Sequence, residues 1–181
     1  MKHEVFKTSL NVEETDITFE EIYKKKYIPI EYIDEIKGAN LLIIPNENFR
    51  DEGDVLFPET TREFFDYIKS QSGDQVIADI AISDEDFQMI ELHSAVIEVA
   101  SIIVQLAILP IATSMIASFL YDLVKKYNRS ADTTSAKVKI IVEETESKKS
   151  KIITYEGPVS GVKDTIESSK ELFSEGKKDD N

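Results

Sequence analysis

Apolar residues fall into short runs separated by charged or turn-forming segments, and the spacing within each run predicts its secondary structure. Four runs rich in β-branched residues predict strands at residues 41–44, 76–82, 137–143 and 151–155. The first run lies between Gly38 and Pro45 and is apolar throughout, which is typical of a strand buried on both faces. A polar turn joins the last two runs, so we expect them to form a β-hairpin.

Capping patterns predict where helices begin. Thr18 is followed three residues later by Glu21, and Thr60 by Glu63, so both segments match a capping box and predict helices over 18–25 and 60–71. Ser83 is the expected cap of a short helix through residue 90. A closing helix is expected from residue 160, with its apolar side chains on one side.

The segment 99–121 contains twenty-three residues without a charge. Its polar residues are segregated: Glu98, Ser101 and Gln105 share one helical face, and Ser114, Ser118 and Asp122 share another beyond Pro110. This pattern predicts two amphipathic helices that meet at Pro110, within residues 95–128. The apolar residues expected to bury in an interface or a membrane are Ile102, Ile103, Leu106, Leu109, Pro110, Ile111, Met115, Phe119 and Leu123.

A membrane-inserting or pore-type protein is the alternative interpretation of residues 99–121. At about 1.5 Å per residue, a helix of this length crosses a hydrocarbon core of about 30 Å. Lys125, Lys126 and Arg129 would then place the C-terminal flank in the cytoplasm and the acidic N-terminal portion outside. Since no apolar run near the N-terminus has the length of a secretory signal, we expect a cytoplasmic protein, with membrane association as the alternative.

Together these elements predict an α+β fold. We expect a mixed sheet of about four strands, including the C-terminal hairpin, packed against a very apolar helix pair broken at Pro110. The expected organisation is an N-terminal helical arm (1–38), a single α+β domain (39–174) and a charged tail (175–181). The apolar face of the helix pair would bury in the core, in a homo-oligomer or against a protein partner.

Composition narrows the classes of partner. The chain has 181 residues, 41% hydrophobic and 31% charged, which is typical of a folded protein. Its formal net charge is -14, so nucleic-acid binding is not expected. The acidity is concentrated in residues 38–94, which hold 13 acidic and 3 basic residues and carry -10. There is no cysteine, which excludes disulfides, thiolate metal sites and cysteine nucleophiles.

Few side chains suggest chemistry. Asp84, Asp86 and His93 are the candidates for a metal or acid–base site, although the acidic triplet lacks the glycine and downstream glutamate of a calcium loop. Asn48 and Arg50 follow the first strand, where open α/β folds place ligands, and are the candidates for anion binding. No phosphate loop, dinucleotide fingerprint or nucleophile elbow occurs. We therefore expect no cofactor and a non-enzymatic interaction or adaptor module.

The order of elements also resembles a known family in layout. From residue 40 to residue 173 the chain runs strand, helix, strand, apolar helix, hairpin and closing helix, and the apolar helix leads into Tyr121-Asp122-Leu123-Val124-Lys125-Lys126. This layout resembles the small effector-associated constant components of bacterial conflict systems. Where that family has a Gly-rich entry to the apolar helix, this chain has Glu98-Val99-Ala100-Ser101. The resemblance implies a non-enzymatic adaptor encoded beside an effector, and it implies no site residues.

Overall fold

The computed structural model describes residues 7–47, 49–50, 53–91, 94–144 and 149–174, and these form a mixed α+β structure, as predicted. The strands are β1 (Ser9–Thr15), β2 (Leu41–Ile44), β3 (Asn46–Glu47), β4 (Val55–Pro58), β5 (Ala78–Ile80), β6 (Met89–Ile90), β7 (Ile97–Glu98), β8 (Ser101–Gln105), β9 (Ser135–Glu144) and β10 (Lys149–Pro158). The α-helices are α1 (Phe19–Tyr23), α2 (Ile33–Gly38), α3 (Thr61–Gln71), α4 (Leu109–Lys126), α5 (Val162–Ser168) and α6 (Glu171–Ser174). Short 3-10 turns precede α2, α4 and α5.

The larger sheet has seven strands among the described residues, in the order β1-β10-β9-β8-β2-β5, with β7 beside β9. It is therefore larger than the four strands expected. The predicted hairpin is confirmed, because β9 and β10 pair antiparallel along their whole length. Sequence patterns missed three strands of this sheet, β1, β7 and β8. β1 comes from the predicted helical arm and pairs antiparallel with β10 as an edge strand. Its sequence is mostly polar and exposed, so it lacks the apolar signal of a central strand.

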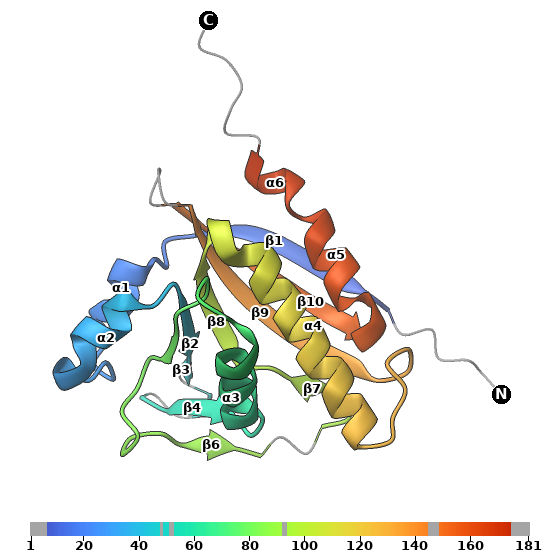
Figure 1. The fold of residues 1–181 in the computed structure, drawn as a ribbon, viewed down its shortest axis with the longest axis horizontal. Helices are drawn as coiled ribbons and strands as arrows, with labels where there is room; N and C mark the ends of the chain where they lie inside the picture. The colour runs from blue at the N-terminus through green and yellow to red at the C-terminus, as the bar shows by residue number, and fades with distance from the viewer. Residues whose placement is uncertain (1–6, 48, 51–52, 92–93, 145–148, 175–181) are drawn as a thin grey trace, which may run out of the picture.

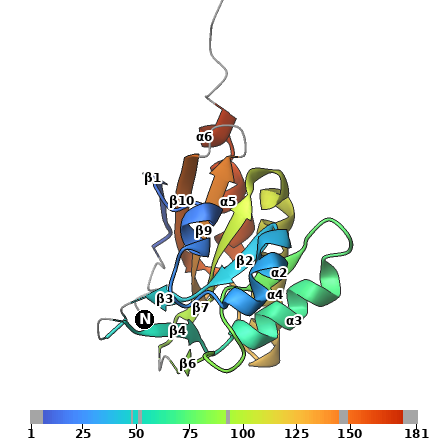
Figure 2. The same cartoon turned by 90° about the vertical axis from the view of Figure 1, so that its left-hand side faces the viewer.

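Two parallel strand pairs require crossover connections, and helices α3 and α4 supply them. β8 is parallel to β9, and α4 connects the two strands. β2 is parallel to β5, and the connection between them contains β3, β4 and α3. The small sheet has the order β3-β4-β6 and lies at the opposite end of the molecule from α6 (Figure 1 and Figure 2).

Strand alternation divides the core into two layers. Leu41 and Ile43 of β2 pack in the larger core with α3, α4 and α5, which lie across one face of the sheet (Figure 1). Leu42 and Ile44 point to the opposite face and pack with α1, α2 and the intervening Ile28. Successive side chains of a strand point to opposite faces, so an unbroken apolar run is what a strand covered on both sides requires.

The predicted helix pair about Pro110 is wrong in its first half. Residues 101–105 form β8, a central strand whose first four side chains are buried, and only the second half is helical. Periodicity cannot separate a strand buried on both faces from a buried helix, and the spacing of Ser101 and Gln105 fitted a helical face by coincidence. Pro110 lies in the first turn of α4, where its missing N–H leaves no backbone carbonyl unpaired, so it begins the helix instead of breaking it.

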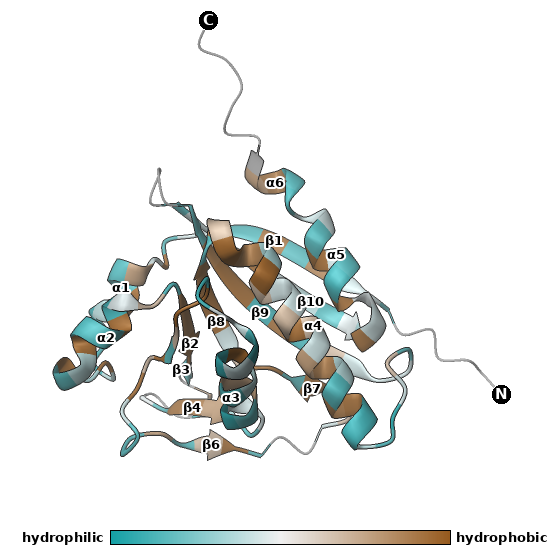
Figure 3. Cartoon of the chain, in the orientation of Figure 1, coloured by the Kyte–Doolittle hydropathy of each residue, from teal (hydrophilic) through white to brown (hydrophobic). Residues whose placement is uncertain are grey.

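The apolar helix is mostly buried in the protein itself. Residues 106–126, the 3-10 turn and α4 together, form the one helical stretch, among those described, that is long and apolar enough to cross a membrane. In its 18-residue apolar window, 61% of the residues are buried. Its buried apolar residues pack in the larger core with the strands of the sheet. Most of the helix is hydrophobic, and hydrophilic residues, which include the exposed Lys125 and Lys126, lie towards its C-terminal end (Figure 3). Six of the nine apolar residues singled out from the sequence are buried: Ile102, Ile103, Leu109, Met115, Phe119 and Leu123. Leu106 and Ile111 are half-buried, and Pro110 is exposed.

Three smaller expectations also differ. The strand expected at 76–82 is shorter, Ala78–Ile80. The short helix expected from Ser83 is absent: residues 84–86 form a turn, in which the Ser83 hydroxyl accepts the N–H of Asp86 at 3.2 Å, and the chain continues into β6. The closing helix is two short helices, α5 and α6. The helix predicted at 18–25 is confirmed as α1, capped as expected by Thr18, whose hydroxyl accepts the N–H of Glu21 at 3.2 Å.

Candidate functional site

The strongest charge asymmetry of the molecule lies at the end formed by the small sheet, α3 and the turn after β5. We call residues 46–91 the acidic end, because they include all 13 acidic residues of the segment that carries -10. Among the described residues, most of these acidic side chains are exposed: Glu47, Glu59, Glu63, Asp66, Asp74, Asp84, Glu85, Asp86 and Glu91. Unburied carboxylates in this number produce a negative potential over one end of the protein.

The three basic residues of the acidic end lie over aromatic rings. The Arg62 guanidinium lies 4.8 Å from the centre of the Phe87 ring, and the Lys69 ammonium lies 5.0 Å from the centre of the Phe65 ring. The Arg50 guanidinium lies 5.7 Å from the ring centre of its neighbour Phe49. Cations at such distances are attracted to the ring face. These basic groups are therefore held against the protein's own aromatic surface.

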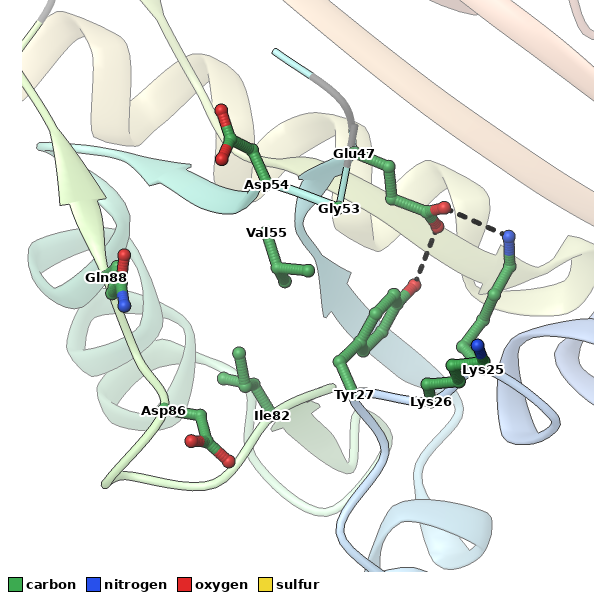
Figure 4. A pocket seen from close by; sticks show the side chains of 10 residues that line it. All are labelled: Lys25, Lys26, Tyr27, Glu47, Gly53, Asp54, Val55, Ile82, Asp86 and Gln88. Carbon is green, nitrogen blue, oxygen red and sulfur yellow. Dashed lines mark hydrogen bonds and ion pairs between the residues drawn. The ribbon is translucent and has the colours of Figure 1, made fainter. Parts of the chain in front are cut away.

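A cleft of about 660 Å³ opens between the acidic end and the segment that follows α1 (Figure 4). We call it the N-terminal cleft. Residues 25–27 line one side, and Glu47, residues 53–55, Ile82, Asp86 and Gln88 line the rest. Its volume lies within the range of small-molecule sites, about 300–1,000 Å³. Segments distant in sequence therefore meet at one concave site.

Glu47 connects the two sides of the N-terminal cleft. One carboxylate oxygen accepts a hydrogen bond of 3.0 Å from the Tyr27 hydroxyl, and the other lies 3.1 Å from the Lys25 ammonium (Figure 4). Burial and the neighbouring Glu47 carboxylate raise the pKa of Tyr27 far above its usual range, so its hydroxyl remains a donor. A second hollow of about 670 Å³ on the sheet side shares Lys25 and Glu47. The ion pair therefore lies at the boundary between the two hollows.

The wall that carries Tyr27 is anchored from both ends. Ile28 is 7% exposed and packs in the core layer beneath α1 and α2. At the other end, the backbone N–H of Phe19 donates a hydrogen bond of 2.7 Å to the Glu143 carboxylate on β9. On the opposite side, Pro45 ends β2 and directs the chain into β3, which presents Glu47. The cleft is therefore built on elements fixed to the main sheet.

The structure describes two of the three residues of the candidate metal site. Asp84 and Asp86 lie on an exposed turn, where the Asp86 carboxylate accepts a hydrogen bond of 2.8 Å from the Ser83 hydroxyl, and His93 lies outside the described residues. Within the described ranges, no group of three or more His, Cys, Asp or Glu side chains could hold a metal ion. Asp86 instead lines the N-terminal cleft.

The structure describes one of the two residues of the candidate anion site. Asn48 lies outside the described residues, and Arg50 is exposed and stacks on Phe49. Residues 44–47 and Phe49, next to these positions in the chain, line the sheet-side hollow. Lys25, Tyr27 and Glu47 were not singled out from the sequence. Glu47 follows the other two by 20 or more residues, and no local pattern indicates that pairing.

Comparisons with protein-family models, with curated proteins and with solved structures find no match for this chain. Its function must therefore be inferred from the geometry of the acidic end and the N-terminal cleft.

Proposed function

We propose that this chain is a non-enzymatic interaction module, an adaptor, that binds a basic partner protein through its acidic end. The observation that carries the proposal is the gathering of exposed carboxylates on residues 46–91, where the basic residues lie over aromatic rings. Complementary potentials steer association and select between partners. The layout resemblance to components of bacterial conflict systems supports the same class of function, with an effector as the partner.

The apolar helix is a poor candidate for the contact surface. Leu109, Met115 and Phe119 were expected to present an apolar face to a partner, but they are at most 7% exposed and pack against the protein's own sheet. A partner could reach them only if the core opened. The acidic end instead exposes Phe49 and Met89, which are 40% and 49% accessible. Aromatic and methionine side chains are enriched in protein interfaces, so both are suitable anchors within the charged surface.

Charge reversal at the acidic end tests this proposal. The variant D84K/E85K/E91K changes three exposed carboxylates that do not line the N-terminal cleft. The matched control D132K/E156K/D164K makes the same change in charge at exposed positions on other elements. Immobilised full-length chain should retain a basic protein from a lysate of its source cells, and association with the purified partner should weaken steeply with salt.

We expect the acidic-end variant to lose this partner and the control variant to retain it. Equal retention by both variants, or retention of only neutral and acidic proteins, would contradict the proposal. Circular dichroism of both variants establishes that a loss of binding is not a loss of folding.

A membrane-inserting protein is the second candidate, and the length of the helix over residues 106–126 favours it. Insertion would require the helix to leave the sheet and expose the larger core. Fractionation of cells that express the chain at native level, followed by a carbonate wash, separates the two functions. An adaptor is released into the soluble fraction, whereas an integral protein stays with the membranes.

A further inference from the structure

The N-terminal cleft has charges of opposite sign on opposing sides. Lys25 and Lys26 lie on one side, and Asp86 lies across the opening from them (Figure 4). Asp54 lies at another edge, with its carboxylate pointing away from the middle of the cleft (Figure 4). Between the two charged sides, Val55 and Ile82 provide apolar surface. The cleft therefore combines a cationic side, an anionic side and an apolar middle within about 660 Å³.

We propose that the N-terminal cleft binds a small zwitterionic ligand of about dipeptide size. Its carboxylate faces Lys25 and Lys26, its ammonium group faces Asp86, and its apolar body lies on Val55 and Ile82. This site does not depend on the acidic end binding a protein partner. Its residues are not altered in the charge-reversal variant described above.

Lys26 is the main anion-binding group of the cationic side. Its side chain is exposed and makes no ion pair with any described residue, whereas Lys25 is already bound to Glu47 at 3.1 Å. The third lysine of the run, Lys24, pairs with Glu21 at 2.6 Å and does not line the cleft. The neighbouring lysines therefore differ in their access to the ligand. Substitution of Lys24 is a matched control for substitution of Lys26.

Asp86 provides a defined acceptor on the anionic side. Its Oδ2 atom accepts the hydrogen bond from the Ser83 hydroxyl, which orients the carboxylate and leaves Oδ1 for a ligand ammonium group. Gln88 lies on the same side and adds an amide that can donate or accept.

The paired charges make a zwitterion a better ligand than a simple ion. An anion attracted to Lys26 also meets the field of Asp86, and a cation attracted to Asp86 meets the field of the two lysines. A molecule with both groups gains on both sides, so removing either charge from the ligand should cost affinity. This selectivity distinguishes a binding site from a solvated charged surface.

Titration calorimetry of the full chain with glycyl-leucine tests the proposal. The two comparison ligands are N-acetyl-glycyl-leucine, which lacks the cation, and glycyl-leucinamide, which lacks the carboxylate. We expect saturable binding of the free dipeptide with a Kd of about 1 mM, weakened about tenfold or more in either capped ligand. K26Q should weaken the free dipeptide by a similar factor, and K24Q should not change its affinity.

D86N extends the test to the anionic side. An asparagine at this position retains an acceptor for Ser83, so folding is preserved while the negative charge is lost. We expect D86N to weaken the free dipeptide and not to weaken N-acetyl-glycyl-leucine, whose affinity should stay equal or rise because the repulsive charge of Asp86 is lost. No saturation by glycyl-leucine up to about 10 mM, equal affinity for free and capped ligands, or equal effects of K26Q and K24Q would each overturn the proposal.

Discussion

The Glu143 carboxylate on β9 accepts a hydrogen bond of 2.7 Å from the backbone N–H of Phe19, the first residue of α1 and 124 residues earlier in the chain. The first N–H groups of a helix have no partner within the helix. Glu143 therefore caps α1 from the main sheet and holds the segment that leads to Tyr27 and the N-terminal cleft.

Removal of this cap should destabilise the protein. We expect E143A to lower the free energy of unfolding by about 1–2 kcal/mol, because a half-buried charged acceptor is lost and the N–H of Phe19 is left unpaired. E143Q keeps a side-chain acceptor and should cost less. Urea denaturation measures both, with E156A, at an exposed position of β10, as the control. Equal stability of E143A and E156A would show that the cap contributes nothing.

A close approach of Tyr155 to Gly161 predicts a second effect. A Cβ atom on Gly161 would lie 2.8 Å from the Tyr155 hydroxyl oxygen, which itself donates a hydrogen bond of 2.6 Å to the Pro158 carbonyl. We expect G161A to cost about 1–3 kcal/mol of stability through overpacking. In a Y155F background the oxygen is gone, so the same substitution should cost less. A double-mutant cycle by urea denaturation measures the coupling, and additive costs would exclude this contact as the cause.

Two buried serines should respond in opposite ways to substitution by alanine. Ser150 and Ser169 are each 2% exposed. The Ser169 hydroxyl donates a hydrogen bond of 2.6 Å to the Ile166 carbonyl, whereas the Ser150 hydroxyl has no partner among the described residues. We expect S169A to lose about 1 kcal/mol of stability and S150A to be neutral or stabilising. Thermal denaturation of the two variants measures this difference in stability. An equal loss of stability in S169A and S150A would refute the prediction.

The buried tyrosines make stability fall at high pH. Burial raises the pKa of Tyr27, Tyr23 and Tyr155 above the usual value of 10.0. A raised pKa in the folded state means that folding favours the protonated phenol. The stabilisation is therefore complete below about pH 10 and is lost as the pH rises from there towards the folded-state pKa.

An absorbance titration of the phenolate band measures this effect. We expect part of the tyrosine signal in the folded protein to appear above the usual range and to move into that range in urea. Y27F should also make the decline of stability above about pH 10 shallower. A single transition at the usual pKa in the folded protein would contradict this prediction.

Helix α4 offers a direct comparison of its buried and exposed sides. Phe119 is 4% exposed and packs its ring 5.1 Å from that of Phe64, whereas its neighbour Ser118 is exposed. We expect F119A to cost about 3–5 kcal/mol of stability and S118L to cost less than about 0.5 kcal/mol. Chemical denaturation without detergent measures both. A minor effect of F119A would show that α4 is not part of the core in solution, as the membrane-inserting alternative requires.

The amino-acid sequence by itself determined the elements whose signals are local. Gly38 and Pro45 bound β2, and a polar turn connects β9 to β10. The Thr18 cap marks the start of α1. Each signal acts within a few residues, through backbone restriction, side-chain alternation or a capping hydrogen bond. The α+β class and the excess of acidic residues in the segment 38–94 also follow from the sequence alone.

Only the tertiary structure decided which apolar segments are strands and which side chains meet. Residues 101–105 and most of α4 lie in the charge-free stretch 99–121, and residues 101–105 are a strand because β2 and β9 supply backbone partners on both sides. β1 has a polar sequence and exists because β10 has an open edge. The cleft depends on Glu47 reaching Lys25 and Tyr27 across 20 or more residues. These choices depend on contacts between distant segments, which form only when the whole chain has folded.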